Sequence, residues 1–580
     1  MTRDTPTGSA CSTSAAPPSV AAGAVLLGCA VTLIVHGYQF GQSNHSVYLI
    51  DALRKADPAL LANDWFYTQT LQYHSAFGWL SAALIEVGAL RAGFLAIYAA
   101  MVLTMHVSWR SIVRAIGGDE RAYLLAVVLY YLSAGGIGLG TYQFLQDSAV
   151  LASNVANVAM LAGVAALIGA RWLPAGLAMG VAALFHLNHA VVCALIWTAF
   201  SAHVNRMDSR AWLARGYLAG SALAVAGCLA NVIPAAMAKL GHAQHLPLNE
   251  FVDLYVMLRH PHHYAPLALP WPIWLAFTFW IPWSVAAWWS WPTDASTAAP
   301  RRRATFLLAC FVGLIAVSVV FAGVWYVSET LVQLSLLRFS PFAHLLMVSF
   351  SAVMLARVRA LVWALPACIA VAVTVMLVSP YQELIRARLS SAGAMVAMCA
   401  APATLPWLTR RRLLFPAGVL VIAGVLALWP FVTGLTRPTI TPDRDYLALC
   451  AWARDPANTS TDAVFLVPPY EEDFRWHARR AIVVNWKSVP QLSGELPEWR
   501  DRLSAVLGWA NLDPLPRGAY LATVAAMRER YDRVPTDALL SAAKRYGARY
   551  LLATRDLGPA FRQRRAGPAF GRFLLYDLSR

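Results

Sequence analysis

Long blocks of apolar residues alternate with short polar segments over the first three quarters of the chain. The blocks are about 17–25 residues long, which is the length that an α-helix needs to cross a hydrocarbon core of about 30 Å. They predict thirteen membrane spans, at residues 19–37, 91–109, 122–139, 149–169, 173–187, 190–205, 213–234, 271–290, 304–324, 341–356, 360–378, 392–408 and 413–431. The pattern therefore predicts an all-α polytopic membrane domain over residues 19–436.

The two ends of the chain depart from this pattern. Residues 1–18 are small and polar, and they predict a disordered cytoplasmic tail. The first apolar block has no small-residue cleavage site, so we expect an uncleaved first span. In residues 437–580, helix-type segments such as "PEWRDRLSAVLG" alternate with short β-branched runs such as "AVFLVP" and "AIVVNW". This alternation predicts a small α/β domain after the membrane domain.

Composition and charge agree with a membrane protein. Hydrophobic residues make up 58% of the chain and charged residues 13%, against about 25% charged in an ordinary soluble domain. The net charge is +16, but in a membrane protein arginines mark the cytoplasmic loops. We therefore expect the lipid bilayer and no nucleic acid as a partner. Seven of the eight cysteines lie in the tail or in apolar spans, which indicates no disulfide framework.

The distribution of charge predicts the topology. If the N-terminus is cytoplasmic, the loops on its side hold 15 Lys and Arg residues and the opposite loops hold 8. This bias fits the positive-inside rule. An odd number of spans then places residues 437–580 outside, in the periplasm, with the protein in the inner (plasma) membrane. Nine of the 14 acidic residues in 1–436 lie on or near the same outer face, and none lies in the middle of a span, which favours an outward-facing site.

The first outer loop, residues 38–90, is the richest in candidate chemistry. Its segments "SVYLIDALRKADPALLA" and "SAFGWLSAALIEVGAL" predict two short helices in the membrane interface, with a break at Pro58. The loop carries His45 before the first segment, Asp51 within it, and Asp64 between the two segments.

The arrangement resembles the GT-C class of glycosyltransferases, which are multi-span enzymes with a large first extracytoplasmic loop of two interfacial helices and an essential acidic residue in it. Three stretches also resemble an uncharacterised bacterial family of GT-C-like membrane proteins: "GQSNHSVYL…ADPALLANDWF", "RHPHHYAP" and "FRWHARRAIVVNWKSVP". The paired Asp-Glu of some protein mannosyltransferases is missing from this first loop.

The resemblance implies a transferase whose donor is a sugar on a polyprenyl phosphate and whose acceptor is a glycan, lipid or protein at the outer face. A carboxylate would accept the proton of the acceptor hydroxyl, and cations would stabilise the leaving phosphate. We expect Asp64 as the base, with Asp51 second and His45 orienting the acceptor. The alternative for Asp64 is a helix cap or a solvated side chain.

Further candidates come from other outer segments. Arg259, His262 and His263 lie in "RHPHHYAP", where a fixed interfacial turn facing the lipid phosphate is favoured over a metal site. Arg338 is a lone outer cation that either binds phosphate or snorkels. Asp147 in "YQFLQDSAV", and His186 and His189 in "FHLNHA", lie on the same predicted side and are expected to bind substrate.

Two other functions stay open at this point. The chain could be a transporter or flippase for lipid-linked glycans, or a non-catalytic envelope assembly protein with the same architecture. The sequence assigns no cofactor and no metal ligands, although a divalent metal stays open.

Overall fold

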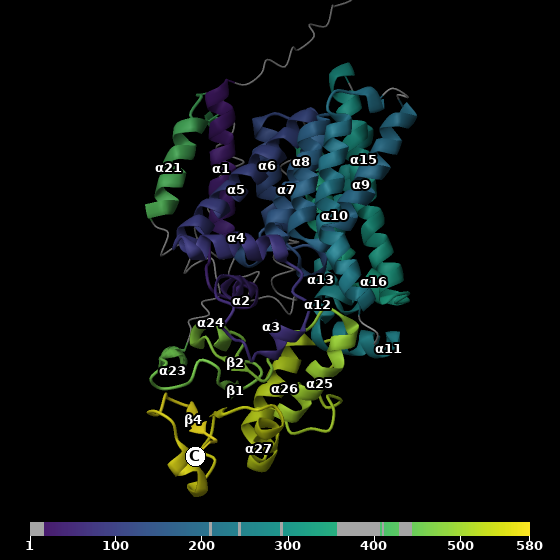
Figure 1. Ribbon diagram of the computed structural model, residues 1–580. Coiled ribbons are helices and arrows are strands. Elements are labelled where there is room, and N and C mark those ends of the chain that lie inside the picture. The colour runs from purple at the N-terminus through teal and green to yellow at the C-terminus, as the bar shows by residue number, and fades with distance from the viewer. Residues whose placement is uncertain are drawn as a thin grey trace, which may run out of the picture.

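The computed structural model describes residues 17–207, 211–241, 245–290, 294–356, 407–408, 411–427 and 443–579. Long helices form a bundle, and the C-terminal domain lies against one end of it (Figure 1). The bundle contains α1 (Pro18–His36), α5 (Leu90–Ala115), α6 (Glu120–Ala134), α7 (Ala152–Ile168), α8 (Trp172–Phe185), α9 (Leu187–Met207), α10 (Tyr217–Gly241), α13 (Trp271–Thr278), α14 (Trp280–Ser290), α15 (Ala295–Val319), α17 (Ser340–Leu355) and α21 (Leu414–Ala427).

The bundle confirms a multi-pass helical membrane protein. In the described part of the chain, six helices are long and apolar enough to cross a membrane, or seven if a bent pair counts as one span. Every predicted span up to residue 356 overlaps at least one observed helix. The predicted spans 360–378 and 392–408 fall almost entirely outside the described residues, as does the predicted tail 1–18, so the number of thirteen spans stays a prediction.

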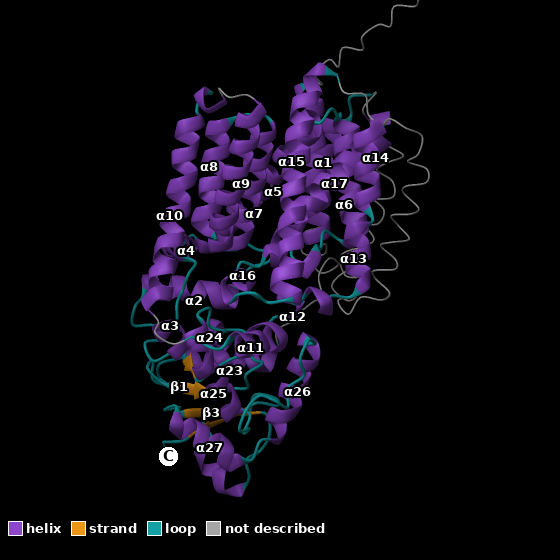
Figure 2. Ribbon diagram, turned by 90° about the vertical axis from the view of Figure 1, so that its right-hand side faces the viewer, coloured by secondary structure: helices purple, strands orange, loops and turns teal. Residues whose placement is uncertain are grey.

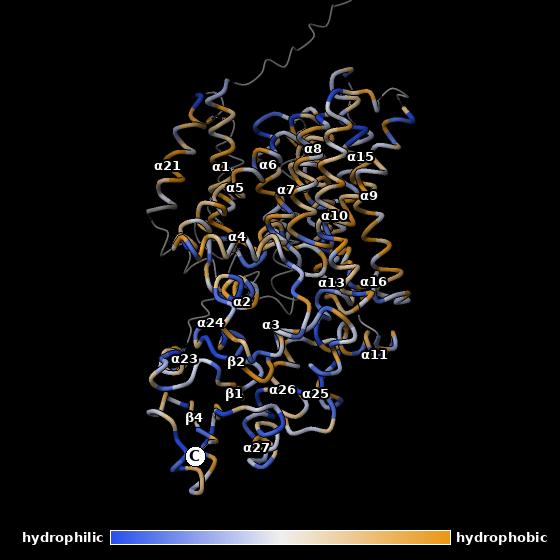
Figure 3. The backbone as a smooth tube through the Cα atoms, viewed as in Figure 1, coloured by the Kyte–Doolittle hydropathy of each residue, from blue (hydrophilic) through white to orange (hydrophobic). Residues whose placement is uncertain are grey.

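Two predicted spans are interrupted. The span predicted at 271–290 consists of α13 and α14, which are separated at Phe279. The span predicted at 149–169 begins only at Ala152, and the turns before it, Leu139–Ser148, are bent by 102° from α7. Figure 3 shows apolar segments concentrated in the bundle and mixed segments below it. The irregular backbone at this end of the bundle supplies loops for the cavity described below.

Glycines bring helices α8 and α10 into close contact. A Cβ atom at Gly227 would lie 2.2 Å from the carbonyl oxygen of Gly180, and one at Gly176 would lie 2.0 Å from that of Gly220. Small residues allow such close backbone approach, which is the usual way in which helices associate in lipid.

Short helices and turns lie between the bundle and the C-terminal domain (Figure 2). They are α2 (His45–Ala56), α3 (Trp65–Gln69), α4 (Ser75–Glu86), η1 (Leu139–Thr141), η2 (Gln146–Ser148), α11 (Leu248–Phe251), η4 (Val252–Arg259), α12 (Pro261–Tyr264), η5 (Pro266–Ala268), η6 (Val320–Val324), α16 (Glu329–Gln333) and η7 (Leu336–Phe339). The turn η3 (Ala211–Leu213) instead connects α9 and α10 at the other end of the bundle. Helices α2 and α4 confirm the two short helices predicted in the loop 38–90, and α2 ends at Ala56, directly before the predicted break.

The C-terminal domain is a small α/β unit, as the alternation of segments predicts. Its elements are α23 (Arg444–Arg454), β1 (Val464–Leu466), α24 (Phe474–Ala478), β2 (Ala481–Ile482), η8 (Ser493–Glu495), α25 (Leu496–Val506), α26 (Tyr520–Arg533), α27 (Thr536–Arg545), β3 (Tyr550–Ala553), η9 (Pro559–Arg564) and β4 (Leu574–Asp577). The sheet order is β2-β1-β3-β4. Strand β1 pairs in parallel with β2 and β3, and β4 pairs antiparallel with β3, with Leu551 opposite Tyr576.

This domain shares a hydrophobic core with the first loop. One buried cluster contains Trp65, Phe66 and Tyr67 of the loop together with Trp486 and Trp499 of the domain. Removing the domain from the loop would expose these large side chains to water, at about 25 cal/mol for each Å² of apolar surface. The first loop and the C-terminal domain therefore form one structural unit at the end of the bundle.

The close packing of α8 on α10 yields a stability prediction. We expect Gly227→Leu to lower the free energy of unfolding by about 1–3 kcal/mol, because the new side chain overlaps the α8 backbone. Thermal unfolding in detergent measures this. Gly313→Leu on α15 is the matched control, since no described atom lies within 4 Å of its Cβ position. Equal midpoints for the two variants would contradict the prediction.

Candidate functional site

A cavity of about 330 Å³ lies where the first loop, the end of the bundle and the C-terminal domain meet. Its polar walls come from all three parts of the chain, which are far apart in the sequence. The charged and imidazole side chains that line it are Asp51, His74, Asp147, Arg259, His260, His262, His263, Arg338 and Lys487. The structure thus gathers Asp51, Asp147, Arg259, His262, His263 and Arg338 from the residues that the sequence singled out.

Arg259 is held firmly in the wall of this cavity. It is 5% exposed. Its Nε donates to the Trp486 carbonyl at 2.8 Å and its Nη2 donates to the Lys487 carbonyl at 3.2 Å. Its guanidinium also lies over the rings of Trp486 and Tyr520, at 5.3 and 5.4 Å from their centres. Among the described residues no carboxylate forms an ion pair with Arg259.

Arg338 is the second guanidinium of the cavity. It lies 4.4 Å from the centre of the Tyr142 ring, and its Nε has no hydrogen-bond partner in the part of the chain that is described. His263 stacks on the same tyrosine at 4.6 Å and 13°, and its Nδ1 donates to the Gly140 carbonyl at 2.7 Å. A buried cation without a carboxylate is costly unless an anion compensates it. Arg259 and Arg338 thus bring to one cavity two guanidinium groups that form no ion pair with a described carboxylate.

Glycine is required at position 140 of this wall. Gly140 has φ 67°, and a Cβ there would lie 2.9 Å from the Tyr142 ring and 3.2 Å from the His263 carbonyl. The turn therefore fixes Tyr142, and through it the guanidinium of Arg338.

Two carboxylates face the same cavity as these cations. Asp147 has a left-handed backbone, φ 56°. It accepts hydrogen bonds from Ser43 Oγ at 2.9 Å and from Asn44 Nδ2 at 2.8 Å. Within the described part of the chain, every recorded hydrogen bond to this carboxylate ends on Oδ2. Asp51 instead forms an ion pair with Lys55, one helical turn away on α2.

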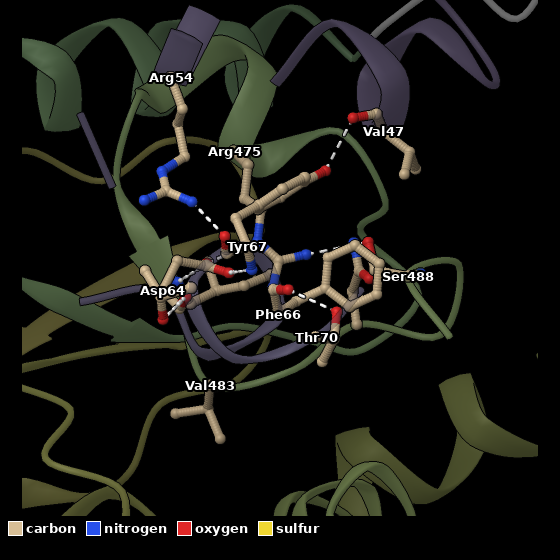
Figure 4. A network of polar contacts seen from close by, with 12 residues as sticks. Val47, Arg54, Asp64, Phe66, Tyr67, Thr70, Arg475, Val483 and Ser488 are labelled. Atoms are coloured by element: carbon tan, nitrogen blue, oxygen red, sulfur yellow. Dashed lines mark hydrogen bonds and ion pairs between the residues drawn. The ribbon is translucent and has the colours of Figure 1, made fainter. Parts of the chain in front are cut away.

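Asp64 does not line the cavity. It is fully buried and caps α3, where its Oδ1 accepts from the Tyr67 N–H at 3.4 Å. Its Oδ2 accepts from Arg475 Nε at 2.7 Å and from the Ile482 N–H at 3.1 Å (Figure 4). The position of Asp64 supports the helix-cap interpretation and a role in joining the C-terminal domain to the first loop. It gives no support to Asp64 as a base.

His45, His186 and His189 also lie outside the cavity walls. His45 Nδ1 accepts from the Gly41 N–H at 3.0 Å, and its Nε2 donates to the Val150 carbonyl at 2.8 Å, so it joins two loops. His186 stands behind His74, with ring centres 5.1 Å apart, and His189 follows at 5.0 Å. His189 Nε2 bonds Asn157 Oδ1 at 2.8 Å. These three histidines support the walls from behind, and their predicted roles toward substrate stay predictions.

The sequence did not point to several wall residues. His74 lies outside the quoted motifs, and Tyr142 begins the quoted stretch "YQFLQDSAV" without being singled out as a candidate. Lys487 lies in "FRWHARRAIVVNWKSVP", a stretch quoted above only for its family resemblance. No group of three or more His, Cys, Asp or Glu residues that could hold a metal ion occurs among the described residues.

Comparisons with known proteins find one matching sequence family, over a short segment, and solved structures that are similar over most of the chain. Residues 444–506 match a family described as a domain of unknown function, DUF6798. The chain is similar to the crystal structure of ArnT from Cupriavidus metallidurans in the apo state, with TM-score 0.48, 17% identity and 96% of each chain covered. It is similar to the same protein bound to undecaprenyl phosphate, with TM-score 0.46, 16% identity, and 96% of this chain and 97% of that chain covered. No curated protein matches the chain.

The Asp64–Arg475 pair yields a second prediction. We expect Asp64→Asn to weaken the attachment of the C-terminal domain by about 3–5 kcal/mol, because it leaves the Arg475 guanidinium, 1% exposed, without its counter-charge. Limited proteolysis with trypsin and thermal unfolding measure the effect. Asp57→Asn is the control on the same loop, since Asp57 is exposed. Equal protease resistance of the two variants would show that the Asp64–Arg475 pair does not hold the C-terminal domain in place.

His74 yields a third prediction, on pH. Burial, reinforced by the charge of Arg338, lowers the pKa of His74 to about 3. Between this pKa and the ordinary value of about 6.5, the unfolded chain binds a proton that the folded chain does not, so stability falls as the pH falls. From pH 7.5 to 5.5 we expect a loss of about 1.4 kcal/mol from His74 alone. Burial also lowers the pKa values of His260, His262 and His263, which adds loss of the same sign.

Thermal unfolding of the wild type and of His74→Gln at both pH values measures the contribution of His74. The variant should lose less stability on acidification than the wild type does. An identical loss in the two proteins would show that His74 takes up a proton in the folded state as readily as in the unfolded state.

Proposed function

We propose that this protein is a GT-C-like membrane glycosyltransferase that moves a sugar from a polyprenyl-phosphate donor to an acceptor hydroxyl at the outer face of the membrane. One observation carries the proposal. Arg259 and Arg338, two guanidinium groups without a carboxylate partner in the described residues, line one cavity together with Asp147 and Asp51. A site for an anion and a proton acceptor therefore adjoin each other at the end of a helical bundle.

The cations suit a phosphate group. A guanidinium presents N–H donors in a fixed fork that matches phosphate oxygens, and charge-assisted hydrogen bonds are about twice as strong as neutral ones. As the bond between the anomeric carbon and the phosphate oxygen breaks, negative charge grows on the leaving polyprenyl phosphate. Arg259 and Arg338 would stabilise that charge where it develops.

Asp147 suits the role of the base better than the other carboxylates. Its Oδ2 is held by Ser43 and Asn44, which fixes the carboxylate and leaves Oδ1 to accept the proton of the attacking hydroxyl. The oxygen of that hydroxyl forms the new bond to the anomeric carbon. Asp51 also faces the cavity, but the Lys55 ammonium forms an ion pair with it. Asp64 is engaged with Arg475.

The outer location rests on the distribution of charge along the chain. The arginine-rich loops predict the cytoplasmic side. The C-terminal domain, which supplies Lys487 to the cavity wall, lies at the opposite ends of the helices (Figure 1). On that side no nucleotide donor is required, and a lipid-linked donor could present its phosphate at the level of the interface. We therefore place the C-terminal domain in the periplasm.

A transfer assay tests this function. Membranes containing the protein are supplied with polyprenyl-phosphate hexoses labelled in the sugar, and release of polyprenyl phosphate is followed. We expect Asp147→Asn to reduce turnover by about 10²–10⁴-fold, the usual contribution of a general base. Asp57→Asn, at an exposed position of the first loop, should leave turnover unchanged.

Binding is measured separately with undecaprenyl phosphate, the ligand in one of the two ArnT structures. Arg338→Gln should weaken it at least tenfold, the change that corresponds to the loss of about one charge-assisted hydrogen bond. A wild type that binds the lipid but transfers no sugar would favour the transporter or assembly alternative. A wild type that does not bind it would overturn the proposal.

A further inference from the structure

The segment that matches a domain of unknown function, residues 444–506, forms part of the cavity wall. Lys487, Ser488, Val489 and Gln491 of this segment line the cavity. Its sheet is also capped by the first loop, because Asp64 accepts from the backbone N–H of Ile482 in β2. Because these residues line the cavity and the first loop holds their sheet, the segment belongs to the site and is not a separate domain attached beside it.

Lys487 is the one cation that this segment sends into the cavity. Its Nζ lies 3.0 Å from Glu472 Oε2 and donates to Ser43 Oγ at 3.5 Å. Ser43 Oγ in turn donates to Asp147. Burial alone would lower the pKa of Lys487, but the nearby carboxylates of Glu472 and Asp147 outweigh it and raise the pKa above its usual value. The ammonium group therefore stays charged at neutral pH.

Ser43 and Asp147, which this hydrogen bond joins, both have a strained backbone. Ser43 has φ 52° and Asp147 has φ 56°, and both are left-handed conformations that residues other than glycine rarely adopt. Such strain persists where the surroundings fix it, and it occurs often at ligand sites. Here the contact among Lys487, Ser43 and Asp147 joins the C-terminal domain to two separate loops at the wall of the cavity.

We propose that residues 444–506 act as the ligand-binding roof of the cavity, with Lys487 as a third cation for the phosphate group of a lipid-linked ligand. This inference rests on the phosphate-binding role proposed above for the cavity. An ammonium group has three donors, and the contacts with Glu472 and Ser43 use two of them. The third donor is left for an oxygen of a phosphate group held between Arg259, Arg338 and Lys487. The bundle and the roof would then bind one ligand together.

Variants of Lys487 and Glu472, which should change the affinity for the lipid phosphate in opposite directions, test this role of residues 444–506. Binding of undecaprenyl phosphate is measured in detergent with the full-length protein. Lys487→Met should weaken binding about tenfold, as the loss of a charge-assisted hydrogen bond would. Lys487→Arg should restore most of it. Glu472→Gln should strengthen binding severalfold, because it frees Lys487 from a competing carboxylate, whereas a purely structural role for the pair predicts no gain. Lys544→Met is the control, since Lys544 is an exposed lysine of the same domain and is no part of the cavity wall.

The outcomes separate this inference from the proposed function. If Arg338→Gln weakens binding while folded Lys487→Met and Glu472→Gln both stay within twofold of the wild type, the roof assignment is wrong and the proposed function stands. If Arg338→Gln also leaves binding unchanged, both fall. Should Lys487→Met fail to fold, Glu472→Gln decides alone. Inorganic phosphate is measured in parallel, and binding as tight as that of the lipid would show that a free phosphate is the ligand.

Discussion

The buried ion pair between Asp64 and Arg475 is the contact on which the shape of the cavity depends. Neither side chain is more than 1% exposed. A buried charge without its partner costs several kcal/mol. The first loop and the C-terminal domain therefore have to stay together to keep both charges paired. The pair is surrounded by the aromatic core that the first loop shares with the C-terminal domain. Because these contacts hold the domain in place, its residues 487–491 can serve as a wall of the cavity.

The cavity combines excess positive charge with a strained backbone. Ser43, Thr141 and Asp147 line it in left-handed conformations, and Ser335, also left-handed, bonds Tyr142 from the adjacent turn. A left-handed residue other than glycine costs about 1–2 kcal/mol. Hydrogen bonds such as that from Ser43 to Asp147 offset part of this cost. Tyr142, fixed by Gly140 and His263, orients the Arg338 guanidinium in turn. The site is therefore held in place before any ligand binds, which lowers the entropy lost on binding.

Much of the architecture could be predicted from local patterns. Apolar blocks predicted helices that the structure contains up to residue 356, and short β-branched runs predicted the strands β1 and β2. The sequence also assigned Arg259, His262 and Arg338 to one side of the membrane, and the structure brings them to one cavity. It favoured Asp64 as the base and assigned Asp147 only to substrate binding, whereas the structure has Asp147 in the cavity wall and Asp64 outside it. Both lie in polar loops with similar neighbours, and the partner that buries Asp64 is 411 residues away.

The sequence by itself determined the class of the molecule, because crossing a bilayer and forming a strand depend on hydropathy within one short segment. It determined the helical bundle, the α/β domain that follows it, and the set of charged residues near one end of the helices. Only the tertiary structure decided which of those charges face a cavity and which neutralise each other. Such pairing depends on distances between side chains from remote segments, and no pattern along the chain records those distances.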